Sequence, residues 1–223
     1  MEVKNTIYDI LGYILPGALL VLLVVFGWAQ CHGNLSSDYS NMLNSFWGKI
    51  KELGWGQKVL IIGLFYLLGH LVSSVSSLFI GDWIVDDEKL LDRNLFTQYE
   101  NKLEKDYHCA PNHKTFRLCV CHVEAKQPEV YSTAFAFLSF YGMARNTCFL
   151  LLGFTIWEVY ILTAAFLYGQ QDAIYFPTKL AGTAFVALIV VFYTYYRFLK
   201  YYRQHIIYGF LLKEKADGNE GEK

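Results

Sequence analysis

The chain has 223 residues, 54% of them apolar and 17% charged, and its formal net charge is −1. Soluble domains average about 45–50% apolar and about 25% charged residues, and general nucleic-acid binders are normally strongly basic. Composition and charge therefore argue against an ordinary soluble protein and against a general nucleic-acid binder. Because the apolar residues lie in four blocks, we expect an all-α polytopic membrane protein.

Four segments are long and apolar enough to cross a bilayer as helices, since about 20 residues at about 1.5 Å each match a hydrocarbon core of about 30 Å. These predicted spans are 10–29, 59–80, 148–168 and 180–199. The predicted organisation is 1–81 for transmembrane helices 1 and 2 with an outer loop at 30–57, 82–145 for a cytoplasmic helical segment, 146–215 for transmembrane helices 3 and 4 with a C-terminal cytoplasmic helix extension, and 216–223 for a disordered tail.

The basic residues predict the orientation, because cytoplasmic segments of membrane proteins carry an excess of Lys and Arg. With the N-terminus inside, all but four of the 19 Lys and Arg residues fall on the cytoplasmic side. The exceptions are Lys49, Lys51, Lys58 and Lys179. We therefore expect a multi-pass protein of the inner (plasma) membrane with both termini in the cytoplasm.

Pro16 and Gly17 lie within the first turns of the first span. Proline loosens a helix, and glycine allows the close approach of a neighbouring helix. The pair marks either a helix start with an interfacial anchor or a functional hinge.

The outer loop carries apolar residues at helical spacing from Tyr39 to Leu53. Lys49, Lys51 and Glu52 fall largely on the other face. This pattern predicts an amphipathic helix on the outer membrane surface.

The second span carries a stripe of small and polar residues. His70, Ser73, Ser74 and Ser77 fall at i, i+3, i+4 and i+7, so they share one helix face. Small residues allow close helix approach, and hydroxyls can hydrogen-bond across it. The stripe predicts either a tight helix–helix interface or a water-lined path.

The cytoplasmic segment contains an amphipathic pattern. Leu91, Leu95, Tyr99 and Leu103 recur at four-residue intervals among charged residues. Such a helix needs a partner for its apolar face. That partner is the chain's own remainder, a sister subunit or another protein.

Cysteines and histidines cluster between 108 and 122. Cys109, His113, Cys119 and Cys121 are candidate zinc ligands, but no Cys-x2-Cys knuckle is present, and Cys119 and Cys121 would project to opposite sides of a helix. Cytoplasmic cysteines are also expected to be reduced. We therefore predict no metal site.

Glu158 lies near the middle of the third span, with about ten apolar residues on either side. A carboxylate there costs several kcal/mol unless it is paired, wetted or protonated. His70 lies near the middle of its own span and is one possible partner. The other possibility is that Glu158 faces a neighbouring subunit, where it is satisfied by hydroxyls or protonated. In either case the sequence favours assembly or gating, with ion or proton conduction as the rival hypothesis.

Basic residues gather at the predicted cytoplasmic face of the third and fourth spans. They are Arg145, Arg197, Lys200 and Arg203, and the last three stand among tyrosines. Anionic headgroups attract such residues, so we expect them to contact anionic lipid or a partner.

Motifs for catalysis are missing from the sequence. It has no phosphate-binding loop, nucleophile elbow, metalloprotease helix or dinucleotide fingerprint. His70 and Ser73 lie on one face of one helix, where neither can readily act on the other's target. We expect no enzymatic activity, no cofactor and no small-molecule substrate.

Three short motifs suggest a family. They are Tyr8-Asp9-x-Leu11-Gly12-Tyr13-x-x-Pro16-Gly17 at the start, Pro128-Glu129-Val130-Tyr131 leading to Arg145-Asn146, and the Tyr- and Arg-rich exit at 196–203. With this layout the chain resembles the small four-helix inner-membrane proteins of bacterial anti-phage defence operons, and most of all the membrane subunits of Kiwa systems. The resemblance implies an oligomeric membrane sensor that controls a cytoplasmic DNA-binding effector.

We therefore expect a homo-oligomeric sensor or scaffold subunit in contact with membrane lipid. It would bind a cytosolic effector protein through 82–145 and the C-terminal helix, without binding nucleic acid directly. The alternative is an ion- or proton-conducting pore lined by Glu158 and the stripe of His70 and the serines.

Overall fold

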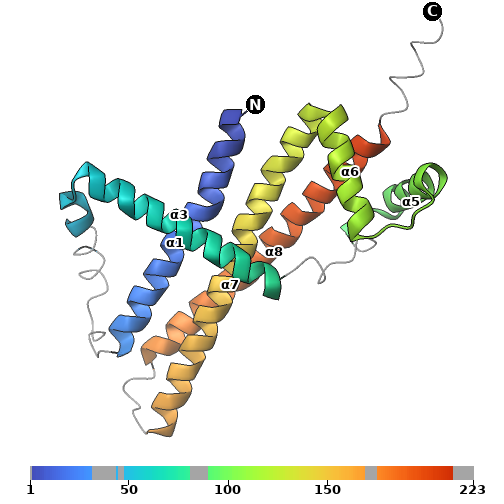
Figure 1. Ribbon diagram of the computed structural model, residues 1–223. Helices are drawn as coiled ribbons and strands as arrows, with labels where there is room; N and C mark the ends of the chain where they lie inside the picture. The colour runs from blue at the N-terminus through green and yellow to red at the C-terminus, as the bar shows by residue number, and fades with distance from the viewer. Residues whose placement is uncertain (1, 32–43, 45–47, 81–89, 169–174, 213–223) are drawn as a thin grey trace, which may run out of the picture. The chain divides into compact units, whose positions relative to one another are not determined.

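The computed structural model describes residues 2–31, 44, 48–80, 90–168 and 175–212, and the secondary structure of this part is helical throughout. The labelled helices are α1 (Glu2–Cys31), α3 (Trp55–Phe79), α5 (Arg93–Tyr107), α6 (His113–Lys126), α7 (Pro128–Leu167) and α8 (Tyr175–Leu211) (Figure 1). Residues 48–52 are also helical. Most of the predicted outer-surface helix and the whole predicted tail lie outside the described residues.

Among the described residues, three helical segments are long and apolar enough to cross a membrane, and a shorter apolar one accompanies them. The long ones are Trp55–Phe79, Pro128–Leu167 and Thr178–Leu211, and the shorter one is Gly12–Trp28 within α1. Each overlaps one of the four predicted spans, and Pro128–Leu167 and Thr178–Leu211 extend well beyond theirs. The chain is therefore an all-α protein with the character of a multi-pass membrane protein.

The chain divides into two compact units. The membrane unit comprises Asp9–Phe79 and Met143–Phe192, and the polar unit comprises Met1–Tyr8, Ile80–Gly142 and Tyr193–Lys223. Long helices α7 and α8 each contribute to both units. The polar unit thus adds the end of α8 to the predicted cytoplasmic segment, whereas the predicted ranges grouped that end with the last two spans.

Two local signals delimit the short helices of the polar unit. At the end of α5, His108 adopts the left-handed conformation (φ 51°), and the backbone N–H groups of 108 and 109 satisfy the last carbonyls of the helix. At the start of α6, Asn112 and Thr115 form a reciprocal capping box. The chain between them makes a tight connection, so α5 and α6 can pack on the same core.

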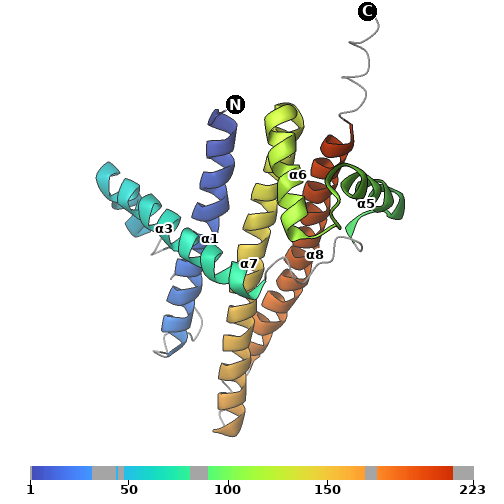
Figure 2. The same ribbon diagram turned by 45° about the vertical axis from the view of Figure 1, so that its right-hand side comes forward.

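The core of the polar unit uses the predicted amphipathic stripe. Leu95, Tyr99 and Leu103 are buried on one face of α5, in a cluster with residues of α6, the start of α7 and the end of α8. Figures 1 and 2 both show α5 and α6 beside the last turns of α8. The sequence left three possible partners open for the apolar face of α5. The partner is the remainder of its own chain.

Lys102 fastens α5 to the end of α8. Its ammonium Nζ donates a hydrogen bond to the carbonyl oxygen of Phe210 at 2.9 Å and lies 4.8 Å from the centre of the Phe210 ring. The carbonyl belongs to the last turn of α8, where backbone acceptors lack helical partners. One side chain thus supplies a charge-assisted hydrogen bond and a cation–π contact.

Replacing Lys102 with methionine should lower the stability of the polar unit by about 1–3 kcal/mol, because the charged donor is lost while the apolar stem is kept. Amide hydrogen exchange at the end of α8 should become faster in the full-length protein. The same replacement at Lys114, which is exposed on α6, is the control. Equal protection in both variants would show that the Lys102 contact does not stabilise this helix end.

Candidate functional site

Within the membrane unit, α1 and α3 cross with their backbones in contact. A Cβ atom on Gly17 would collide with the carbonyl oxygen of Phe65, and a Cβ on Gly69 would collide with that of Tyr13. Both views show the two helices crossing (Figures 1 and 2). Only glycine permits this approach, so the crossing point is specified by two residues that are 52 positions apart.

The crossing also accounts for Pro16 and His70. Pro16 is buried next to Gly17, and α1 continues as a helix through it. The imidazole of His70 stacks on the ring of Tyr13 at 3.8 Å between centroids and meets Tyr66 edge-on at 4.5 Å. His70 therefore takes part in an aromatic contact between α1 and α3. A hinge role for Pro16 and Gly17 stays a prediction.

A hydrogen-bonded triad lies between α1 and α7. The amide nitrogen Nε2 of Gln30 donates to Oε1 of Glu158 at 2.7 Å, and the indole Nε1 of Trp157 donates to Oε1 of Gln30 at 2.9 Å. An indole N–H can only donate and a carboxylate can only accept. The Gln30 amide, placed between them, therefore has one orientation that satisfies both neighbours.

Glu158 is fully buried within the single chain, with 0% of its surface exposed. Within the described part of the chain, its second oxygen, Oε2, has no hydrogen-bond partner. The alternative that Glu158 needs a neighbouring subunit to cover it is therefore wrong, because α1 of the same chain covers it. Burial of one unsatisfied carboxylate oxygen costs free energy, which makes this triad the best candidate for a functional site.

The predicted pairing of Glu158 with His70 is also wrong. Glu158 bonds to Gln30, whereas His70 stacks on Tyr13. Tyr13 and Gln30 are 17 residues apart on α1, which is about 25 Å of helix. The two side chains thus contact α1 at well-separated positions along its axis.

The contact face of α3 differs from the predicted stripe. Its buried residues are Gly69, Val72 and Ser76, a set displaced by one residue, or about 100° around the helix, from His70, Ser73 and Ser77. Ser74 and Ser77 are exposed, and their hydroxyls donate to carbonyl oxygens of their own helix.

A second polar contact joins α3 to α7. The hydroxyl of Ser76, which is fully buried, donates to Oδ1 of Asn146 at 2.6 Å. The guanidinium of Arg145 donates to the hydroxyl oxygen of Ser73 at 3.2 Å. Arg145, predicted as a lipid or partner contact, thus lies half-buried against α3. Ser73, like His70, is a member of the stripe that contacts another helix.

The other basic candidates have separate environments in the polar unit. Arg203 is 4% exposed, with its guanidinium 4.6 Å from the Phe116 ring, so its prediction as a surface contact is wrong: the aromatic core encloses it. Lys200 pairs with Asp92 at 3.9 Å. Arg197 is exposed, and its Nε donates to the Tyr201 hydroxyl at 3.1 Å.

The cysteine and histidine cluster is dispersed. Cys119 is buried, with its sulfur 3.9 Å from the Tyr99 hydroxyl, whereas Cys109 and Cys121 are exposed. The side chain of His113 is outside the described set. Among the side chains that are described, no three His, Cys, Asp or Glu groups stand together as a metal site would require.

Four residues that make polar contacts were not predicted from the sequence. They are Gln30, Trp157, Ser76 and Asn146. Gln30 was placed in the outer loop, although α1 runs through it to Cys31. The adjacent Trp157 and Glu158 offered a signal, since both carry polar groups that need partners inside an apolar helix. Comparison of the chain with protein-family models, with curated proteins and with solved structures finds no match.

Proposed function

We propose that the chain is a membrane-embedded sensor or scaffold subunit that couples an event in the membrane to a cytosolic partner. The observation that carries this proposal is the course of α7. This helix of 40 residues, about 60 Å long, holds Glu158 in the membrane unit and Ala134 in the core of the polar unit. Because an unbroken helix is stiff, a rotation or shift of α7 in one unit displaces the residues that it contributes to the other.

The proposed topology places both termini and the polar unit in the cytoplasm. The positive-inside distribution of Lys and Arg supports it. The apolar face of α5 is already filled by its own chain, so we propose that the partner binds the polar outer surface of the unit. The family resemblance leads us to propose further that the subunit is homo-oligomeric and serves an anti-phage defence system of the inner membrane.

Within this proposal the triad of Glu158, Gln30 and Trp157 is the element that gates α7. A buried carboxyl group with one unsatisfied oxygen contributes little to stability. The triad therefore holds α7 in place only weakly. A modest disturbance of α1 can therefore release α7. The rival pore would need Glu158 and His70 along one path, and their separate contacts with Gln30 and Tyr13 do not favour it.

The test uses Glu158→Leu in the native gene context, with Glu129→Leu as the control on an exposed part of α7. Both proteins should insert at normal levels. Protection of cells against phage should fall about tenfold or more for Glu158→Leu alone, because the gating contact with α1 is lost. Unchanged protection in that variant would remove Glu158 from the coupling.

Ion flux separates the proposed function from the pore. The full-length protein, reconstituted in vesicles, should leave a proton or potassium gradient intact. A steady flux that Glu158→Gln abolishes would overturn the sensor proposal and establish a pore.

A further inference from the structure

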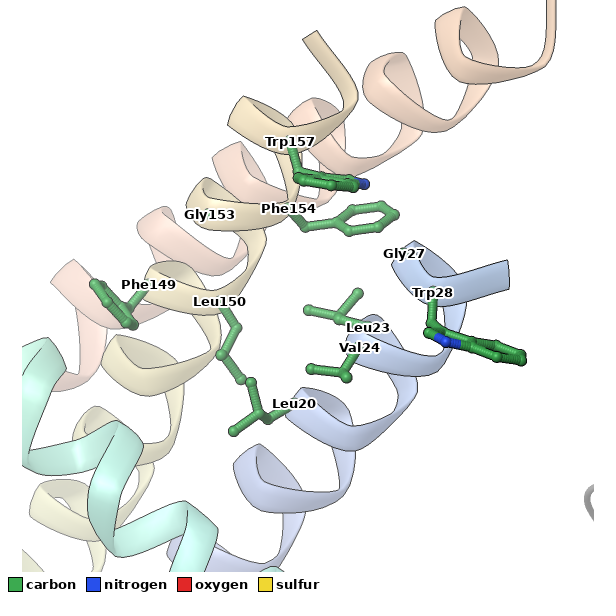
Figure 3. Close-up of a pocket in the computed structure, with 10 residues that line it drawn as sticks. All are labelled: Leu20, Leu23, Val24, Gly27, Trp28, Phe149, Leu150, Gly153, Phe154 and Trp157. Carbon is green, nitrogen blue, oxygen red and sulfur yellow. The ribbon is translucent and has the colours of Figure 1, made fainter. Parts of the chain in front are cut away.

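An apolar groove of about 600 Å³ lies between α1 and α7 in the membrane unit. Figure 3 shows Leu23 and Val24 of α1 facing Leu150 and Phe154 of α7 across it. Its ten lining residues are aliphatic or aromatic except for Gly27 and Gly153. We propose that this groove binds one acyl chain of a membrane phospholipid.

The position of the groove identifies its surroundings. Its α1 wall lies wholly within the apolar segment Gly12–Trp28, and its α7 wall lies within the membrane-crossing candidate Pro128–Leu167. Its rim is open, since 61% of Val24 and 60% of Trp28 are exposed. In a bilayer this opening meets hydrocarbon, and a space of this size between two spans is filled by whatever hydrocarbon fits it.

The dimensions favour a single chain over a helix of a second copy. With a diameter of about 10 Å, a helix would fill 600 Å³ with only about five residues. The same space accommodates about 20 methylene groups if each occupies about the 30 Å³ of a liquid water molecule, which is the scale of one acyl chain. Bulky walls also fit poorly with helix–helix interfaces in membranes, where small residues dominate.

One end of the groove is suited to the polar part of a lipid. Trp28 and Trp157 line it. Trp28 is the last residue of the apolar segment Gly12–Trp28, and tryptophan favours the layer where hydrocarbon meets headgroups. Trp157 also donates to Gln30 in the triad. A bound acyl chain therefore contacts the residue that orients the Gln30 amide, next to Glu158.

Gly153→Leu narrows the groove without a Cβ clash against the neighbouring helices. A Cβ at Gly153 would meet nothing within 4 Å, and the same is true of Gly182 on α8. Gly182→Leu is therefore a matched control: it adds the same side chain to an open surface of another apolar helix. Both substitutions also favour the helical state.

The experiment uses the full-length protein in vesicles of phosphatidylethanolamine and phosphatidylglycerol, with a phosphatidylglycerol that carries a diazirine in one acyl chain. After illumination, peptide mass spectrometry locates the cross-links. Wild-type and Gly182→Leu proteins should be labelled mainly at 20–28 and 149–157, about fivefold above the exposed face of α8, and this excess should fall in Gly153→Leu.

Three outcomes would overturn the proposal. Equal labelling of the groove and of α8 in the wild type would mean surrounding lipid only, and this measurement needs no variant. Undiminished labelling in Gly153→Leu would place the lipid elsewhere. A Val24→Cys protein that forms disulfide-linked dimers in the membrane would show that a second copy occupies the groove.

Discussion

Replacing Gly69 or Gly17 with alanine should strongly disrupt the membrane unit. The new Cβ would collide with a backbone carbonyl of the crossing helix, and backbone cannot rotate aside as a side chain can. We expect a loss of about 3 kcal/mol or more, which corresponds to a fall in melting temperature of the order of 10 °C. Thermal unfolding of the purified protein in mild detergent measures it.

Gly63→Ala supplies the control. Gly63 lies on the same helix as Gly69, and a Cβ at Gly63 would meet nothing within 4 Å. This variant should be as stable as the wild type or more stable by about 1 kcal/mol, since alanine is the better helix former. Melting temperatures that fall equally for Gly63→Ala and Gly69→Ala would contradict the close crossing of α1 and α3.

Gln30→Leu should destabilise the protein, and adding Glu158→Leu should restore much of the loss. The single change leaves the fully buried Glu158 carboxyl without its donor, which costs about 2–4 kcal/mol. The double change replaces both partners with apolar groups of similar size, and such exchanges are nearly neutral. A double-mutant cycle from unfolding in detergent gives the coupling free energy.

Glu158→Leu alone should cost less than Gln30→Leu, because Gln30 is only partly buried and still accepts from Trp157. Gln98→Leu, at an exposed position of α5, controls for the gain in apolar surface and should change stability little. Additive effects of the two triad substitutions would show that the hydrogen bond between Gln30 and Glu158 does not stabilise the membrane unit.

The two variant sets separate structure from function. The glycine crossing brings α1 against α3, and the triad joins α1 to α7 near the end of α1. If coupling depends on α7, substitutions in the triad should alter it in proteins that still fold. Substitutions at the crossing should instead lower the stability of the membrane unit itself.

The sequence by itself determined the features that depend on local order. Hydropathy located four apolar segments, because a bilayer-spanning helix needs about 20 consecutive apolar residues. Four-residue spacing predicted the buried face of α5, because residues at i and i+4 share one side of a helix. The isolated carboxylate of Glu158 was recognisable as costly from its apolar neighbours alone.

Only the tertiary structure decided which groups meet. Periodicity identifies a helix face but not what covers it, so it could not choose Gln30 over His70 as the partner of Glu158. Gln30 lies 128 positions from Glu158 in the sequence, and His70 lies 88 positions from it. That choice follows from how α1 packs against α7, and Gly17 and Gly69 separately set the close crossing of α1 with α3. For the same reason Arg203, which the sequence assigned to the surface, lies buried over Phe116: the packing of α6 against α8 encloses it.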